Sequence, residues 1–102
     1  MADPVIIKPG TNSVVVTGGV AVAAIPPNIN GGFITNPQQS ADQGVTPAEA
    51  LYINPIAAGG LVANGTNFAL PPGSTWTIVP GQTTATWVNA ATAGHRFSVV
   101  YW

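Results

Sequence analysis

Cysteine is absent from this sequence of 102 residues, and charged side chains are scarce. About a quarter of the residues of a typical soluble domain are charged, which would be roughly 25 in a chain of this length. The charged residues here are Asp3, Lys8, Asp42, Glu49 and Arg96. The lack of cysteine excludes a disulfide framework and cysteine-based zinc or redox sites. The scarcity of charge means that neutral polar groups, neighbouring subunits, or both must keep the surface soluble and specific.

The two cations, Lys8 and Arg96, lie near opposite ends of the chain. Binding a nucleic-acid backbone or an anionic lipid surface requires several clustered cations, so we expect neither partner. The longest apolar run, from Val14 to Ile25, is interrupted by glycine and is shorter than the ~20 residues of a membrane-spanning helix. The first four residues include an acid and a proline where a secretion signal carries cations. We therefore expect a protein made in the cytoplasm, with no membrane partner.

Few residues are suited to acid-base catalysis. His95 is the only histidine, and its position at the start of an expected strand predicts a surface or turn residue. Asp42 and Glu49 lie in a polar segment, where we expect solvated carboxylates rather than a glycosidase-like pair. The sequence has neither a cluster of metal ligands nor a glycine-rich phosphate loop. We expect no enzymatic activity, no cofactor, no metal and no small-molecule substrate.

Turn residues recur at the spacing of roughly 8–12 residues that is typical of sandwiches and barrels, with short β-branched runs between them. These turn positions include Pro9-Gly10, Gly18-Gly19, Pro26-Pro27, Asn30-Gly31, Asn64-Gly65, Pro72-Gly73, Pro80-Gly81 and Gly94. The chain is long enough for one core. We predict a single all-β domain over residues 1–102, a small antiparallel β-sandwich or barrel of Greek-key or jelly-roll type.

Glycine and proline also indicate which strands are joined by turns. Gly18-Gly19 predicts a two-residue hairpin between strands at 13–17 and 20–25. Pro72-Gly73 predicts a type II turn before a strand at 74–79, in which Trp76 and Ile78 face the core.

The last two strands are expected at 84–89 and 95–102, paired through Ala93-Gly94. In the final strand, one face carries His95, Phe97, Val99 and Tyr101. The other face is also largely apolar toward the end, so we expect the terminal residues to be covered from two sides.

Two segments look less regular. Residues 1–10 place Val5, Ile6 and Ile7 between prolines, which predicts an extended arm or an edge strand. Residues 26–50 are rich in proline, asparagine, glutamine and glycine, which predicts a long polar loop. At its end, Thr46-Pro47-Ala48-Glu49 matches a capping box, so either a short helical turn or an extended approach to a strand at 51–54 follows.

Two local patterns have alternative interpretations. Asn64-Gly65-Thr66 matches the N-glycosylation pattern but more simply encodes a turn. Trp87 could provide a platform for stacking a sugar, although a half-buried tryptophan of a sandwich is the preferred interpretation.

Several segments of residues 31–102 resemble short proteins encoded among the virion structural genes of tailed phages and prophages. The similar segments are Gly31-Gly32-Phe33-Ile34-Thr35-Asn36-Pro37, Ala41-Asp42-Gln43-Gly44, residues 48–55, residues 64–66, Leu70-Pro71-Pro72-Gly73-Ser74-Thr75-Trp76, Val88-Asn89-Ala90-Ala91 and residues 94–102. The resemblance implies a small all-β component of a phage particle, such as a capsid decoration (cement) protein. It carries over no catalytic residue.

The resemblance and the low charge together lead to a functional hypothesis. We expect a homotrimer on the capsid surface of the virion that contacts the major capsid protein through the N-terminal arm or the 26–50 segment. The interface candidates are Val5, Ile6, Ile7, Phe33, Ile34 and Trp102. The alternative is a tail or fibre component, or a host-recognition module that binds carbohydrate through Trp87 or Trp102.

Overall fold

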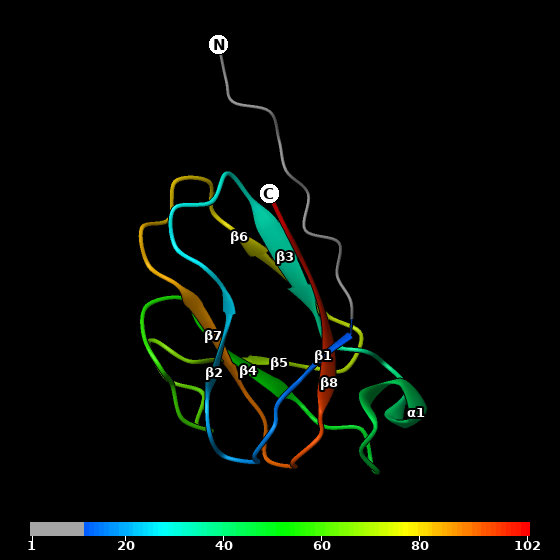
Figure 1. The fold of residues 1–102 in the computed structure, drawn as a ribbon. Helices are drawn as coiled ribbons and strands as arrows, with labels where there is room; N and C mark the ends of the chain where they lie inside the picture. Colours follow the sequence, from blue (N-terminus) through cyan, green and yellow to red (C-terminus); the bar gives the residue numbers. More distant parts are fainter. Residues whose placement is uncertain (1–11) are drawn as a thin grey trace.

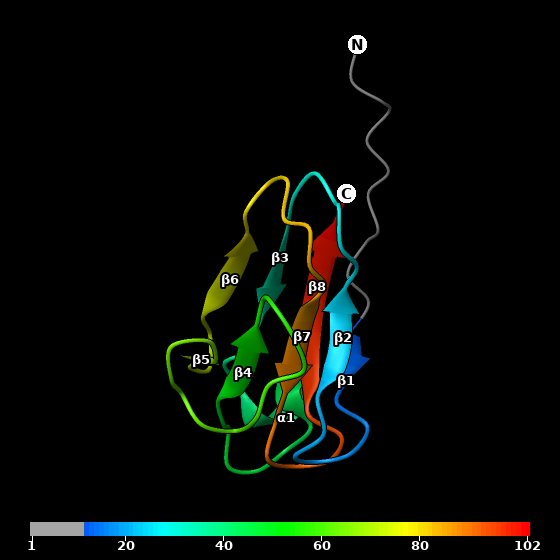
Figure 2. The ribbon, with the colours of Figure 1, turned by 90° about the vertical axis from the view of Figure 1, so that its left-hand side faces the viewer.

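The computed structural model describes residues 12–102, which form two four-stranded antiparallel sheets packed face to face (Figures 1 and 2). The expected antiparallel all-β sandwich is therefore confirmed. The elements are β1 (Asn12–Val14), β2 (Val22–Ile25), β3 (Gly32–Thr35), α1 (Ser40–Gln43), β4 (Leu51–Asn54), β5 (Phe68–Leu70), β6 (Thr75–Ile78), β7 (Thr86–Asn89) and β8 (Arg96–Tyr101). No helix of the described residues is long and apolar enough to cross a membrane.

The strand order is that of a jelly roll. One sheet has the order β1-β8-β3-β6 and the other β2-β7-β4-β5; we name them the β3/β8 sheet and the β4/β7 sheet after their central strands. The pairs β1·β8, β2·β7, β3·β6 and β4·β5 are nested, so the first strand pairs with the last and the middle strands pair with each other. Eight strands wound in this way form the double-sheet jelly roll. The jelly-roll-like alternative named from the sequence is the one observed.

Both expected hairpins are wrong. The strands on either side of Gly18-Gly19 belong to different sheets, since β1 pairs with β8 and β2 pairs with β7. The strands around Ala93-Gly94 are likewise separated, β7 into the β4/β7 sheet and β8 into the β3/β8 sheet. Of the connections between consecutive strands, the one from β4 to β5 stays within a sheet. The turns exist, but they carry the chain across the sandwich.

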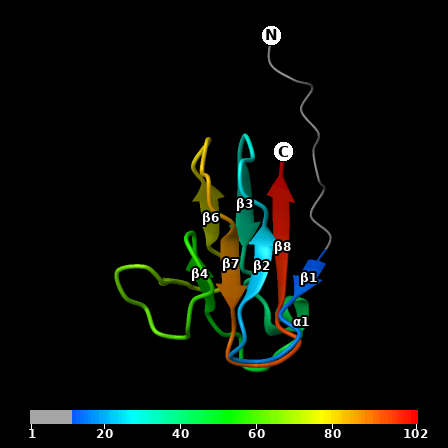
Figure 3. The same cartoon turned by 60° about the vertical axis from the view of Figure 1, so that its left-hand side comes forward.

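The two crossing connections, 15–21 and 90–95, run side by side at one end of the sandwich (Figure 3). Gly19 has φ 79° and donates its N–H to Ala90 O at 2.8 Å. A Cβ on Gly18 would lie 2.4 Å from Ala91 O. Glycine is required here because the connections touch backbone to backbone and because one residue takes a left-handed conformation.

The 26–50 segment is not a continuous loop. Its Gly32–Thr35 portion forms β3, which lies between β8 and β6 in the middle of its sheet. Alternation explains this: Gly32 and Ile34 are buried while Phe33 is exposed, the pattern of a strand with one face in the core. A single helical turn, α1, follows and ends at Gly44, whose φ is 74°.

The capping-box sequence at residues 46–49 does not form a helix. The extended alternative is confirmed, because the chain continues without helix into β4 at Leu51–Asn54.

Other local expectations hold. Gly73 has φ 85° and Ser74 N–H donates to Pro71 O, as in the expected type II turn. In β6, Ile78 is buried and Trp76 partly buried, while the two threonines are exposed. In the last strand, Phe97 and Val99 face the core, and the terminal Tyr101 and Trp102 are both partly covered.

The core lies between the sheets and consists mainly of β-branched and leucine side chains around Phe97: Val15, Ile25, Ile34, Leu51, Ile53, Leu70, Ile78, Val88, Ala90 and Val99. At one open edge of the sandwich, Phe68 of β5 and Trp76 of β6 pack ring against ring with centroids 4.8 Å apart. Because these strands are edges of different sheets, the aromatic pair joins the two sheets where no strand covers the core.

The connection 55–67 is held to the outer side of the β4/β7 sheet by asparagines. Asn89 donates to Gly59 O at 2.8 Å, and Asn54 Nδ2 donates to Asn67 Oδ1 at 2.7 Å. Asn64 Oδ1 accepts the N–H groups of Thr66 and Asn67, so Asn64-Gly65 forms the expected turn. On the same side of the sheet, Trp87 is half-buried, which agrees with the preferred interpretation.

Two glycines of this connection provide a matched test. A Cβ on Gly59 would lie 2.0 Å from Asn67 Oδ1, whereas a Cβ on Gly65 has no heavy atom within 4 Å. We expect Gly59→Ala to lower the free energy of unfolding by about 1–3 kcal/mol, the usual cost of overpacking. Gly65→Ala should stay within about 0.5 kcal/mol of the parent protein. Urea unfolding measures both, and equal stabilities of the two variants would contradict the packing described.

Candidate functional site

The charged side chains of residues 12–102 gather at one end of the sandwich. Asp42 lies on α1, Arg96 begins β8, and Glu49 precedes β4. A Cβ on Gly44 would lie 3.4 Å from Arg96 Nε, which places the arginine side chain against the end of α1. Glu49 bonds to His95, the residue next to Arg96. The charged side chains are therefore localised, and among residues 12–102 the opposite end of the sandwich carries none.

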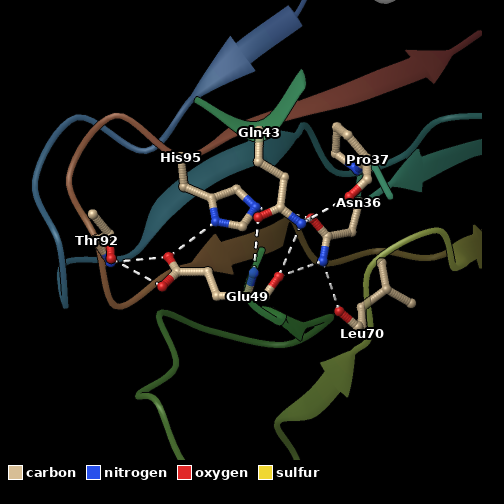
Figure 4. A network of polar contacts seen from close by, with 7 residues as sticks. All are labelled: Asn36, Pro37, Gln43, Glu49, Leu70, Thr92 and His95. Carbon is tan, nitrogen blue, oxygen red and sulfur yellow. Dashed lines mark hydrogen bonds and ion pairs between the residues drawn. The ribbon is translucent and has the colours of Figure 1, made fainter. Parts of the chain in front are cut away.

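The sequence predicts a surface or turn position for His95; its backbone N–H does close the turn that begins at Thr92, but the side chain is not at the surface. Its side chain is fully buried, between Glu49 on one side and Asn36 on the other (Figure 4). Nδ1 lies 3.0 Å from Glu49 Oε1, and Nε2 lies 2.8 Å from Asn36 Oδ1. The burial arises because α1 and the segment that leads to β4 fold against the start of β8, an arrangement that no local pattern around His95 indicates.

Backbone carbonyls fix the orientation of both amides in this network. Asn36 Nδ2 donates to Glu49 O at 3.0 Å and to Leu70 O at 2.9 Å, so its Oδ1 must face His95. Gln43 Nε2 donates to Pro37 O at 2.7 Å, while Gln43 Oε1 accepts the Glu49 N–H at 2.9 Å. An exchanged amide would place oxygen against oxygen in both cases.

The Glu49 carboxylate is held from two sides. Thr92 donates its N–H to Oε1 at 3.0 Å and its hydroxyl to Oε2 at 2.9 Å, and His95 contacts Oε1. Burial alone would raise the pKa of Glu49, but the hydrogen bonds from His95 and Thr92 and the electrostatic influence of His95 outweigh it, so its pKa is lowered from the ordinary value of 4.5. The carboxylate is thus the preferred form.

The network joins segments rather than presenting a reactive group. It connects the end of β3, α1, the approach to β4, the end of β5 and the start of β8 through Asn36, Gln43, Glu49, Leu70 and His95. A histidine that acts as a general base needs a ring nitrogen within hydrogen-bond reach of its substrate. Both nitrogens of His95 contact protein groups instead. Residues 12–102 contain no detected pocket and no group of three or more potential metal ligands.

The outer side of the β3/β8 sheet carries the exposed Arg96 at the α1 end and neutral side chains farther from α1. Strand register places Phe33 beside Val100 of β8 and Thr77 of β6, and Thr35 beside Thr75. Phe33 is 38 % exposed and contacts the Trp102 ring edge to face, with centroids 6.5 Å apart. We call this surface the outer face; it consists of Phe33, Thr35, Thr75, Thr77, Val100 and Trp102.

The sequence-based interface candidates separate into three groups. Val5, Ile6 and Ile7 lie outside the described residues. Ile34 is fully buried in the core and cannot contact a partner, because alternation along β3 turns it away from Phe33. Phe33 and Trp102 are brought together on the outer face. The sequence did not identify Thr35, Thr75, Thr77 and Val100 as residues of the outer face. Alternation along the strands predicted which side of its strand each of Thr75, Thr77 and Val100 occupies, but no sequence pattern predicted that β6 and β8 pair with β3.

Searches of protein-family models, curated protein sequences and solved structures found no match to this chain.

Removing Asn36 tests the importance of the network. Asn36→Ala removes a hydrogen-bond partner from the buried carbonyls of Glu49 and Leu70. It also removes a partner from the side-chain nitrogens of Gln43 and His95. We therefore expect the free energy of unfolding to fall by about 3 kcal/mol or more. Thr92→Val removes one peripheral hydroxyl and should cost about 1 kcal/mol or less. Urea unfolding at neutral pH measures both. A smaller loss for Asn36→Ala than for Thr92→Val would show that the network is not structural.

The lowered pKa of Glu49 predicts an acid dependence with a defined sign. A carboxyl whose pKa is lower in the folded state stabilises the fold above its unfolded value, and this stabilisation is lost as pH falls through the folded value. We expect Glu49→Gln to be less stable than the parent at pH 7, with the difference shrinking below about pH 4.5. Asp42→Asn removes another carboxylate from the same end and serves as the control. Urea midpoints between pH 7 and pH 3 provide the measurement; a gap that stays constant would contradict the expected linkage.

Proposed function

We propose that this chain is a structural protein of a tailed-phage virion, of the capsid decoration (cement) type, that attaches to the major capsid protein by non-covalent contacts. The observation that carries the proposal is the separation of charge from the outer face. The charged side chains of the described residues lie at the α1 end, where Arg96 of β8 occupies the margin of the outer side of the β3/β8 sheet. Threonine, valine and aromatic side chains cover the part of that side that lies away from α1.

Such a surface is suited to burial against a neighbour. Neutral apolar and hydroxyl groups lose far less solvation free energy than ions when they enter an interface. A standard interface hides about 800 Å² per partner, and mostly apolar surface of that size supplies ample association energy before the entropic costs are subtracted. Attachment through neutral groups also depends little on salt, because there are few charges to screen.

The jelly-roll topology is compatible with this role, since viral capsid domains and lectin domains both use it. A shared fold does not by itself establish function. The sequence resemblance to virion proteins favours the capsid role, on the capsid surface and as a homotrimer. Val5, Ile6 and Ile7 supply a further apolar segment for contact with a neighbour.

Placing a charge on the outer face tests the proposal. Phe33→Asp and Thr77→Asp should each reduce binding of the purified protein to capsids that lack it by about tenfold or more, because an interfacial carboxylate must be desolvated without a partner. Val62→Asp is the matched control, since Val62 is 68 % exposed on the 55–67 connection over the other sheet. Sedimentation with capsids gives the affinity, and circular dichroism verifies that each variant folds.

Undiminished binding of both outer-face variants would exclude this face as the attachment surface. Failure of the parent protein to bind any capsid would overturn the decoration role itself. A variant lacking residues 1–10 measures the contribution of Val5, Ile6 and Ile7 in the same assay, and light scattering determines whether the free protein is a trimer.

A carbohydrate-binding host-recognition module is the second candidate, because lectins share the topology and Trp87 is partly exposed. The neighbouring amides weaken this alternative. Asn54 uses its oxygen for the N–H groups of Ile56 and Ala57 and its nitrogen for Asn67, so it has little left to offer a sugar. Glycan-array binding that is lost in Trp87→Ala would favour the module over the decoration role.

A further inference from the structure

One side of the His95 ring has a fixed protonation. Asn36 Oδ1 carries no hydrogen, and its position is set by the two carbonyls that accept from Asn36 Nδ2. The 2.8 Å contact between Nε2 and this oxygen therefore requires that Nε2 donates. As long as Asn36 keeps its orientation, the ring holds a proton on Nε2 whether it is charged or neutral.

The other side depends on a second proton. Nδ1 lies 3.0 Å from Glu49 Oε1, which already accepts the Thr92 N–H. With Glu49 ionised, this contact is a hydrogen bond only when Nδ1 also carries a proton, that is, when the ring is an imidazolium. A ring protonated on Nε2 alone would direct the Nδ1 lone pair at a carboxylate oxygen, and the two acceptors would repel each other.

The two partners differ in their freedom to separate. The His95 side chain is fully buried, whereas the Glu49 side chain is 22 % exposed. Gln43 and Asn36 donate to backbone carbonyls, and their neutral amides do not ionise at the pH values at which a protein stays folded. The carboxylate of Glu49 is thus the group that is able to move into solvent, and its departure would also break both bonds to Thr92.

We propose that His95, Glu49 and Thr92 form a proton-dependent switch at the charged end of the sandwich. When Nδ1 releases its proton to solvent, the Glu49 carboxylate moves away from the ring and its two hydrogen bonds to Thr92 break. The hydrogen bonds of Asn36 and Gln43 remain. The switch acts within the free protein and does not depend on the proposed role in a virion.

The surroundings contain few other ionisable groups. Asp42 on α1 and Arg96 on β8 are exposed, and neither bonds to the ring in the described structure. The connection 15–21, which crosses beside Thr92, has no ionisable side chain. Glu49 is therefore the one carboxylate of the described residues in hydrogen-bond contact with His95.

Nuclear magnetic resonance tests the switch directly, because the chain contains a single histidine. In protein labelled with 15N, we expect both ring nitrogens to be protonated at low pH and Nε2 alone at high pH. Hydrogen exchange at the Thr92 amide should accelerate about tenfold or more, because this amide loses its bond to the Glu49 carboxylate. The acceleration should have the same pH midpoint as the loss of the ring proton. The Glu49 amide, which donates to Gln43 Oε1, is the reference for the exchange rate.

Variants separate the switch from a general effect of pH. In Glu49→Gln the relative exchange of Thr92 should no longer follow the ring titration, whereas Asp42→Asn should behave as the parent does. A neutral ring protonated on Nδ1 would overturn the proposal. So would a Thr92 amide that is unaffected by the ring titration, or a ring that keeps both protons until the protein unfolds.

Discussion

The α1 end of this sandwich depends on the hydrogen bonds of one residue, Asn36. Its side chain donates to Glu49 O and Leu70 O and accepts from Gln43 and His95, while its backbone bonds to Ser74 and Gly73. All its polar groups are thereby used in a site without exposure. Because an unpaired buried polar group costs free energy, each partner is tied to a fixed place. One residue after β3 thus aligns both sheets, α1 and the start of β8.

Neutral amides do in this protein much of what ions do elsewhere. Asn54, Asn67 and Asn89 fasten the 55–67 connection, and Gln82 donates to Pro55 O, Thr84 O and Thr86 Oγ1 near the other end. Amides satisfy backbone groups without the desolvation penalty of a charge. The few charges can therefore be confined to one end, which leaves the outer face neutral.

Local patterns predicted local structure well. The alternation of β6, the turn at Pro72-Gly73 and the two faces of β8 followed from side-chain period and from the φ preferences of proline and glycine. The same patterns failed at Gly18-Gly19 and Ala93-Gly94, because a glycine pair indicates that the chain turns and says nothing of which sheet the next strand joins. The segment 26–50 was misjudged because its polar residues are those that satisfy buried carbonyls, and β3 within it is only four residues long.

The sequence by itself determined the all-β class, the neutral surface and the inward residues of most strands, since these depend on composition and on contacts between near neighbours. The tertiary structure alone decided the nested pairing of first strand with last and the burial of His95. Glu49 and Asn36 lie 46 and 59 residues away from that histidine in the chain. Contacts between residues so far apart in the sequence depend on how the two sheets pack together. That packing determines which polar groups are buried, and a buried polar group needs a hydrogen-bond partner.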